Sequence, residues 1–316
     1  MWWQRHSTES GIILILFFFI TWSIGIGEVP LYDWDEVNFA ECSREMRVTG
    51  EYLYPQIGFL PFWEKPPLFF WIQSAFMGVF GENAWGARIP NVIITTLTLS
   101  ILFLLGKTWH RAEFGVAWVF LHGISLLPSF YARSGLIDPL FNLFMLGATI
   151  AGSRGIFSPP WGLLMGVLSA LATLTKGPVG VLLPALAVGS LGVIQRKGLA
   201  LLKLGTIAVI PYMLIVGSWI ALLYCNRAHH LISDFFAYQW RLLTTSDAGH
   251  GGPFYYHIVA VAVGMLPASI WALGATRLSF RELPPPAQAI LLLSAWTLLI
   301  FSFVKTKILH YSSLSY

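Results

Sequence analysis

The sequence predicts an all-α polytopic membrane protein, with about nine or more transmembrane helices and two interfacial helices in the first outer loop. Hydrophobic residues make up 56% of the 316 residues and charged residues only 11%, whereas a soluble domain carries about 25% charged residues. Apolar runs that approach the roughly 20 residues needed to cross a bilayer recur along the whole chain. Because the polar residues gather between these runs, we expect them at the membrane surfaces.

Nine apolar segments are the candidate transmembrane helices. They are residues 11–27, 85–105, 113–131, 138–152, 160–175, 178–194, 202–224, 254–275 and 287–304. The fifth and sixth are short for a complete crossing. No small-x-small cleavage site follows the first run, so we expect it to remain as an uncleaved span. Residues 1–316 are expected to form one transmembrane domain. The residues after Lys307 read as the start of another span, which predicts the N-terminal part of a longer protein.

The basic residues predict an orientation and argue against one class of partner. If the N-terminus is cytoplasmic, the short cytoplasmic loops carry more Lys and Arg than the outer ones, as the positive-inside rule requires. The net charge of +4 does not indicate nucleic-acid binding, because the basic residues are scattered without interleaved aromatic residues. Cys42 and Cys225 lie far apart and outside any CxxC or His/Cys spacing, so neither a disulfide framework nor a zinc ribbon is expected.

The first outer loop, residues 28–84, contains the two predicted interfacial helices. Residues 36–48 carry an apolar stripe at helical spacing, and Gly50 can end that helix. The stripe consists of Phe39, Cys42 and Met46. Residues 67–80 are apolar and aromatic, but about 14 residues are too few to span a bilayer easily. Both segments are therefore expected to lie at the membrane surface.

Asp35 is expected to begin the first of these helices. The helix dipole stabilises a negative charge there, and a carboxylate at the boundary between water and lipid can act as a general base toward a hydroxyl or an amine. Helix capping is the competing interpretation, and the local sequence favours it, because Asp33-x-x-Glu36 resembles a capping box. Capping also explains Asp138, which immediately precedes Pro139.

Lysine residues form a second group on the predicted outer face. Lys65 follows Glu64 and precedes two prolines, so its ammonium could be held in place to bind a phosphate. A surface Glu–Lys pair is the alternative. Lys176 lies near a predicted helix C-terminus, where a lysine also complements the dipole. Lys305 and Lys307 flank the end of the last predicted span, where lysines commonly extend toward the headgroups.

Several motifs in a consistent order give these residues a common context. Residues 35–46 resemble the DE-x-x-(Y/F)-AE-x-(S/A)-REM block of bacterial C-type glycosyltransferases, in the branch of the lipid A aminoarabinose transferases and relatives of the protein O-mannosyltransferases. Further matches are 62–68 to (Y/F)-x-EKPP, 137–139 to a second-loop Asp, 174–177 to TKG, and 305–311 to K-x-K-x-x-x-Y. The resemblance runs from about residue 11 to the end of the sequence.

The resemblance implies inverting transfer of a sugar from a polyprenyl phosphate to a lipid or protein acceptor, at the outer face of the bacterial inner membrane. By the family pattern, Asp35 would be the catalytic carboxylate that activates the acceptor for in-line attack. Asp138 would support acceptor or metal binding. The residues that would hold the donor phosphate are Lys65, Lys176 and Tyr311, with Lys307 as a further candidate. Preorganised charges at the leaving phosphate would stabilise the transition state.

Two positions depart from the family pattern. Asn38 stands where the aminoarabinose branch has Arg, three residues after the catalytic Asp. Residues 237–241 lack the His that this branch pairs with the Glu of its EKP block at a metal. Glu64 could therefore bind a divalent metal with another partner such as His250, in a glycine-rich outer loop, or bind none. As a donor, a hexose or another lipid-carried sugar fits at least as well as aminoarabinose.

A transporter or flippase of a lipid-linked molecule is the competing function class. It predicts ionisable residues in the middle of spans and interrupted helices in paired positions. In this sequence the acidic residues cluster at the ends of spans instead. A membrane scaffold without chemistry would leave the ordered motifs unexplained.

Overall fold

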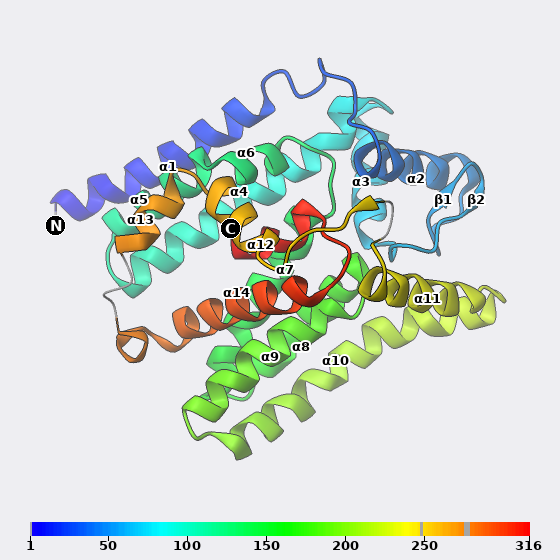
Figure 1. Cartoon of the computed structure of the whole chain (residues 1–316). Helices are drawn as coiled ribbons and strands as arrows, with labels where there is room; N and C mark the ends of the chain where they lie inside the picture. Colours follow the sequence, from blue (N-terminus) through cyan, green and yellow to red (C-terminus); the bar gives the residue numbers. More distant parts are fainter. Residues whose placement is uncertain (1, 247–248, 275–278) are drawn as a thin grey trace.

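The computed structural model describes residues 2–246, 249–274 and 279–316, and most of these are helical (Figure 1). In chain order the elements are α1 (Trp2–Ser23), α2 (Asp35–Thr49), β1 (Gln56–Ile57), β2 (Leu60–Pro61), α3 (Leu68–Phe80), α4 (Ala84–Trp109), α5 (Ala112–Ile124), α6 (Leu126–Ala132), α7 (Asp138–Gly155), α8 (Trp161–Lys176), α9 (Val179–Ile194), α10 (Gly198–Cys225), α11 (His230–Thr244), α12 (Tyr256–Gly264), α13 (Ala268–Gly274), the 3₁₀ helix η3 (Phe280–Glu282), α14 (Pro285–Phe303) and the 3₁₀ helix η4 (Leu309–Ser315). The two short strands pair antiparallel in a hairpin between α2 and α3. The predicted all-α polytopic class is confirmed.

Helices occupy all nine predicted spans, but fewer of them are long. Within the described residues, four helices are long and apolar enough to cross a membrane, namely α1, α4, α10 and α14. The pair α5 and α6, bent by 75°, would make a fifth span. Gly177 (φ +90°) and Pro178 separate α8 from α9, so each has only 16 residues. The predicted span 254–275 is divided into α12 and α13, and residue 275 lies outside the described residues.

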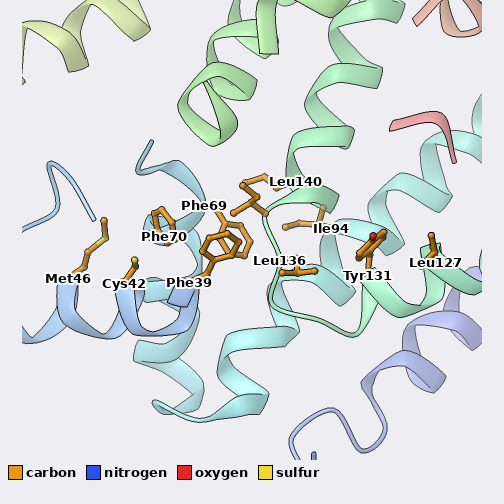
Figure 2. Close-up of a cluster of buried hydrophobic side chains, with 11 residues drawn as sticks. Phe39, Cys42, Met46, Phe69, Phe70, Ile94, Leu127, Tyr131, Leu136 and Leu140 are labelled. Atoms are coloured by element: carbon orange, nitrogen blue, oxygen red, sulfur yellow. The ribbon is translucent and has the colours of Figure 1, made fainter. Parts of the chain in front are cut away.

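The two helices predicted in the first outer loop are present as α2 and α3. The apolar stripe of α2 is buried, and it packs against α3, α4 and the segment that leads into α7 (Figure 2). The main members of this cluster are Phe39, Cys42, Met46, Phe69, Phe70, Ile94, Leu136, Ile137 and Leu140. The stripe therefore fixes the loop on the helix bundle, in addition to any contact that the outer surface makes with lipid.

Close packing of α7, α8 and α10 places the residues of the site. A Cβ atom added to Gly166 of α8 would lie 2.0 Å from the backbone oxygen of Ala208 in α10, so only glycine allows this approach. The first residue of α7, Asp138, forms an ion pair with the last residue of α8, Lys176. The two helices thus run antiparallel, and the start of one lies beside the end of the other.

Candidate functional site

A cavity of about 340 Å³ brings together four of the residues predicted from the sequence. Asp35, Lys65, Lys176 and Tyr311 all line it. Its remaining walls are mostly apolar side chains of α9, α11 and α14. We call this space the site cavity. An adjoining apolar cavity of about 170 Å³ shares Lys65, Pro178 and Phe236 with it.

Asp35 is the first residue of α2, and its side chain is 39% exposed. The residue before the helix is Trp34, and no side chain of the described residues makes a capping hydrogen bond there. The structure therefore does not support the capping interpretation. Trp34 has a φ of 68°, which is uncommon for a non-glycine residue and is often found at functional sites. The Oδ2 atom of Asp35 lies 3.7 Å from Nε2 of His310.

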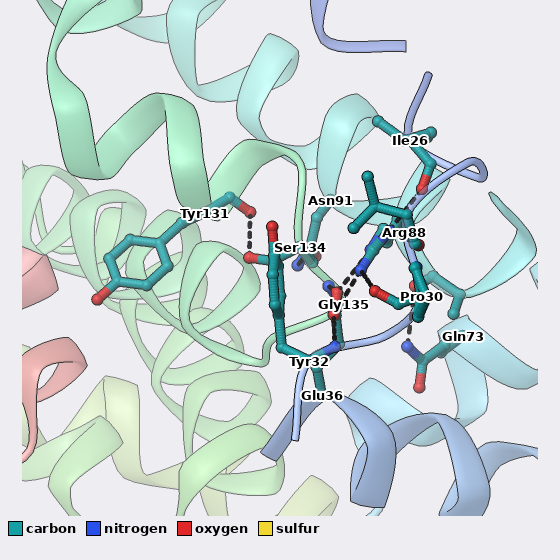
Figure 3. A network of polar contacts seen from close by, with 12 residues as sticks. Ile26, Pro30, Tyr32, Glu36, Gln73, Arg88, Asn91, Tyr131, Ser134 and Gly135 are labelled. Atoms are coloured by element: carbon teal, nitrogen blue, oxygen red, sulfur yellow. Dashed lines mark hydrogen bonds and ion pairs between the residues drawn. The ribbon is translucent and has the colours of Figure 1, made fainter. Parts of the chain in front are cut away.

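Glu36, the neighbour of Asp35, has a different role because it is buried in an ion pair with Arg88 of α4. The guanidinium Nε and one terminal nitrogen donate to the two carboxylate oxygens at 2.8 and 2.7 Å. The backbone N–H groups of Tyr32 and Gly135 donate to the same carboxylate at 2.7 and 2.6 Å (Figure 3). Arg88 also donates to three carbonyls of the linker between α1 and α2. This network ties Asp35 to the segment that precedes Asp138.

Asp138 and Lys176 form a buried ion pair beside the site cavity. The Lys176 ammonium donates to Oδ1 of Asp138 at 2.5 Å, and Ser313 donates to the same oxygen at 3.4 Å. The Oδ2 atom has no hydrogen-bond partner among the described residues. The ammonium also lies 5.3 Å from the centre of the Tyr311 ring. Because an ammonium has three donors, Lys176 can hold Asp138 and still bind an anion in the cavity that it lines.

Lys65 and Glu64 form an ion pair as the alternative predicted, but their side chains are only 13% and 29% exposed, and Lys65 also lines the site cavity. The Lys65 ammonium is 3.8 Å from the Glu64 carboxylate and 5.5 Å from the centre of the Tyr238 ring in α11. Pro66 and Pro67 follow Lys65, and α3 begins directly after them at Leu68. The ammonium is thus placed between the first outer loop and α11.

Lys307 does not line the site cavity with the other predicted cations. Its buried ammonium donates to the carbonyls of Phe301 and Ser302 at 3.0 and 2.7 Å, so it satisfies acceptors in the last turn of α14. Its backbone N–H donates to the carbonyl of His250 at 2.6 Å. The predicted role of Lys307 in donor binding is therefore not supported by its position.

The metal site proposed for Glu64 and His250 has no ligand set in the described part of the chain. No group of three or more His, Cys, Asp or Glu residues there could hold a metal ion. Glu64 is paired with Lys65 instead. A divalent metal at Glu64 therefore stays a prediction, and we derive no step through one.

Two parts of the site, the helix α11 and His310, were not predicted from the sequence. The helix α11 supplies Phe236, Tyr238, Gln239, Leu242 and Leu243 to the cavity wall. Apolar residues recur along it at helical spacing, which is the signal that could have found it. His310 also lines the cavity, and it stands directly before Tyr311 in the K-x-K-x-x-x-Y block.

Comparison with known proteins places the chain in a family. Residues 64–221, half of the chain, match the family described as dolichyl-phosphate-mannose-protein mannosyltransferase. The chain belongs to this family. The resemblance noted in the sequence is thereby confirmed. Together with the apolar helices, membership of this family makes the chain a multi-pass protein of the bacterial inner membrane.

Its relatives include undecaprenyl phosphate-alpha-4-amino-4-deoxy-L-arabinose arabinosyl transferases. The protein from Pseudomonas paraeruginosa is 30% identical over 95% of this chain and 55% of the relative. The protein from Photorhabdus laumondii is 24% identical over 98% of this chain and 57% of the relative. The crystal structure of ArnT from Cupriavidus metallidurans bound to undecaprenyl phosphate matches with a TM-score of 0.82 at 22% identity, over 96% of this chain and 57% of that one. This likeness shows the fold. The chain itself spans just over half the length of these relatives.

Proposed function

We propose that this chain transfers a sugar from a polyprenyl-phosphate donor to a lipid acceptor such as lipid A. The observation that carries this proposal is the site cavity, which combines the Asp35 carboxylate, the Lys65 and Lys176 ammonium groups and apolar walls. Ammonium groups bind phosphate through charge-assisted hydrogen bonds, and apolar walls suit a prenyl chain. The names of the relatives, which specify undecaprenyl-phosphate sugar donors, agree with this chemistry.

In the proposed reaction, an acceptor oxygen attacks the anomeric carbon while the bond from that carbon to the phosphate oxygen breaks. Asp35 takes the proton of the acceptor, and the electron pair of the broken bond leaves with the polyprenyl phosphate. Lys65, Lys176 and Tyr311 stabilise the negative charge that develops on the phosphate. Attack from the side opposite the leaving group inverts the anomeric centre. We place the site on the extracytoplasmic face because the short loops on the other face carry more Lys and Arg.

The donor sugar is the part of the proposal that the relatives do not decide. Their printed names specify 4-amino-4-deoxy-L-arabinose. This chain has Asn38 where we expected Arg in that branch, and no His in residues 237–241. We therefore include hexose donors, and protein as well as lipid acceptors, in the test.

The test measures sugar transfer in membranes that contain the protein, supplied with polyprenyl-phosphate pentose or hexose donors and lipid A. We expect Asp35→Asn to lower kcat by about 10²- to 10⁴-fold, as for loss of a general base. Lys65→Ala should raise the donor KM by about 10- to 100-fold, because a hydrogen bond to a charged group contributes about 1.5–3 kcal/mol.

Two matched controls are exposed residues that do not line the site cavity, Asp33→Asn and Lys203→Ala, and both should transfer as wild type does. Full activity of a folded Asp35→Asn variant would overturn the role of Asp35. Absence of transfer by the wild type with every donor and acceptor would refute the proposed function. A lipid-flipping assay on the same membranes would then test the transporter class.

A further inference from the structure

His310 is held at the site cavity by the segment that follows α14. The backbone N–H groups of Lys305 and Thr306 donate to the carbonyls of Leu243 and Leu242 in α11, each at 3.3 Å. The Lys307 ammonium fixes the same segment to the end of α14. The 3₁₀ helix η4 then packs against α7, α12 and α14 (Figure 1). His310 thus lies on a segment that is hydrogen-bonded to α11 and α14 and also packs against α7 and α12.

The imidazole of His310 faces the carboxylate of Asp35. Its side chain is 12% exposed, and both residues line the site cavity. The distance from Nε2 to Oδ2 is 3.7 Å, which is longer than a hydrogen bond. Catalytic hydrogen bonds are often long without substrate and tighten in the complex. A small movement of either side chain would therefore let a protonated Asp35 donate a hydrogen bond from Oδ2 to Nε2 of His310.

The charges around His310 come from several elements. Asp35 of α2 and Asp138 of α7 favour its protonation, while Lys176 of α8 and Lys65 of the first outer loop oppose it. His257 of α12 is a further titratable neighbour. Burial, the largest effect, lowers the pKa of His310 below its usual value of 6.5. A neutral imidazole can accept a proton at neutral pH.

We infer that His310 is the partner of Asp35: the unprotonated Nε2 of its neutral imidazole faces Oδ2 and receives the proton that Asp35 takes from the acceptor. This inference rests on the proposed function. The acceptor oxygen forms a bond to the anomeric carbon as the bond to the phosphate oxygen breaks. The acceptor proton passes to Asp35, then to Nε2 of a His310 tautomer that carries its own proton on Nδ1, and finally to water. Since His310 acts through Asp35, it is a positioning residue.

The test compares His310→Gln with wild type in the transfer assay. Glutamine keeps a polar group near the carboxylate but cannot accept a proton at neutral pH. We expect kcat to fall by about 10- to 100-fold, at the low end of general acid–base effects, while the donor KM changes by less than about threefold. The acid limb that His310 gives to the wild-type profile of kcat against pH should disappear. In the double variant with Asp35→Asn, kcat should fall no further than in Asp35→Asn alone, because the two residues act as a unit.

The matched control is His230→Gln, an exposed histidine at the start of α11 that does not line the site cavity. It should behave as wild type. Size-exclusion chromatography in detergent would establish that each variant is folded. Wild-type kcat and pH profile in folded His310→Gln, with transfer lost in Asp35→Asn, would overturn this inference and leave the proposed function standing. A raised donor KM at unchanged kcat would also overturn it, because His310 would then bind the donor. No transfer by the wild type would instead refute the proposed function itself.

Discussion

Glu36→Gln is the perturbation that tests how the first outer loop is held. The carboxylate is 1% exposed and accepts four hydrogen bonds, two from Arg88 and one each from the backbone N–H groups of Tyr32 and Gly135. The single amide oxygen of glutamine can keep about two of them. Each lost bond to a charged group contributes about 1.5–3 kcal/mol, and removing one member of a buried ion pair typically costs about 3–5 kcal/mol. We expect a loss of about 3–5 kcal/mol in the free energy of unfolding.

The matched control lies on the same helix. Glu41 makes a two-bond ion pair with Arg44, but both side chains are more than a third exposed. An exposed pair contributes only about 0.2–1 kcal/mol. The assay heats the detergent-purified variants and measures the fraction that stays monodisperse. Glu36→Gln should denature well below Glu41→Gln, and a second substitution, Arg88→Met, should add less than its own separate effect. Equal midpoints for Glu36→Gln and Glu41→Gln would refute the assignment of Glu36 as a structural anchor.

Three further predictions concern other parts of the chain. Lys307→Met removes two hydrogen bonds at the end of α14, so the free energy of unfolding should fall by about 3–6 kcal/mol, while the donor KM should stay within twofold of the wild-type value. Gly166→Val should prevent stable folding in detergent, because its Cβ would meet the Ala208 oxygen at 2.0 Å; a wild-type elution profile would contradict the packing of α8 on α10. The lowered pKa of His310 means that the unfolded chain binds this proton at higher pH than the folded protein. The free energy of unfolding of the protein should therefore fall as the pH drops below 6.5 toward the lower pKa that His310 has in the folded protein. His310→Gln should make this fall smaller.

The sequence predicted the helices and the cavity residues that lie in recognisable local patterns. The helices α2 and α3 were predicted because apolar spacing and Gly50 are local signals. Lys65 and Lys176 were found because each stands beside prolines or a helix end. The break between α8 and α9 was predicted, because Gly177 and Pro178 are local signals. The division of the predicted span 254–275 into α12 and α13 was not, because hydropathy alone does not show a break there.

Long-range partners account for what the sequence did not show. Lys307 carried the same charge as the other predicted phosphate ligands, but its ammonium reaches the carbonyls at the end of α14. His310 contacts a residue that is far from it in the chain, so no local pattern marks the pair. The helix α11 has a recognisable apolar spacing, but its place in the cavity wall depends on the packing of distant elements.

The block of residues 35–46 shows why a motif match alone does not identify the catalytic group. Glu36 accepts four hydrogen bonds, and Glu45 accepts the backbone N–H groups of Gly58 and Phe59 at 2.8 Å each. A carboxylate whose oxygens already hold such donors is poorly placed to take a proton from a substrate. These acids position the loop and its hairpin. Asp35 differs because its carboxylate lines the site cavity and is partly exposed. Most of the acids matched in this block therefore stabilise the structure of the first outer loop. The burial and hydrogen-bond partners of each acid favour Asp35 as the residue that contacts the acceptor.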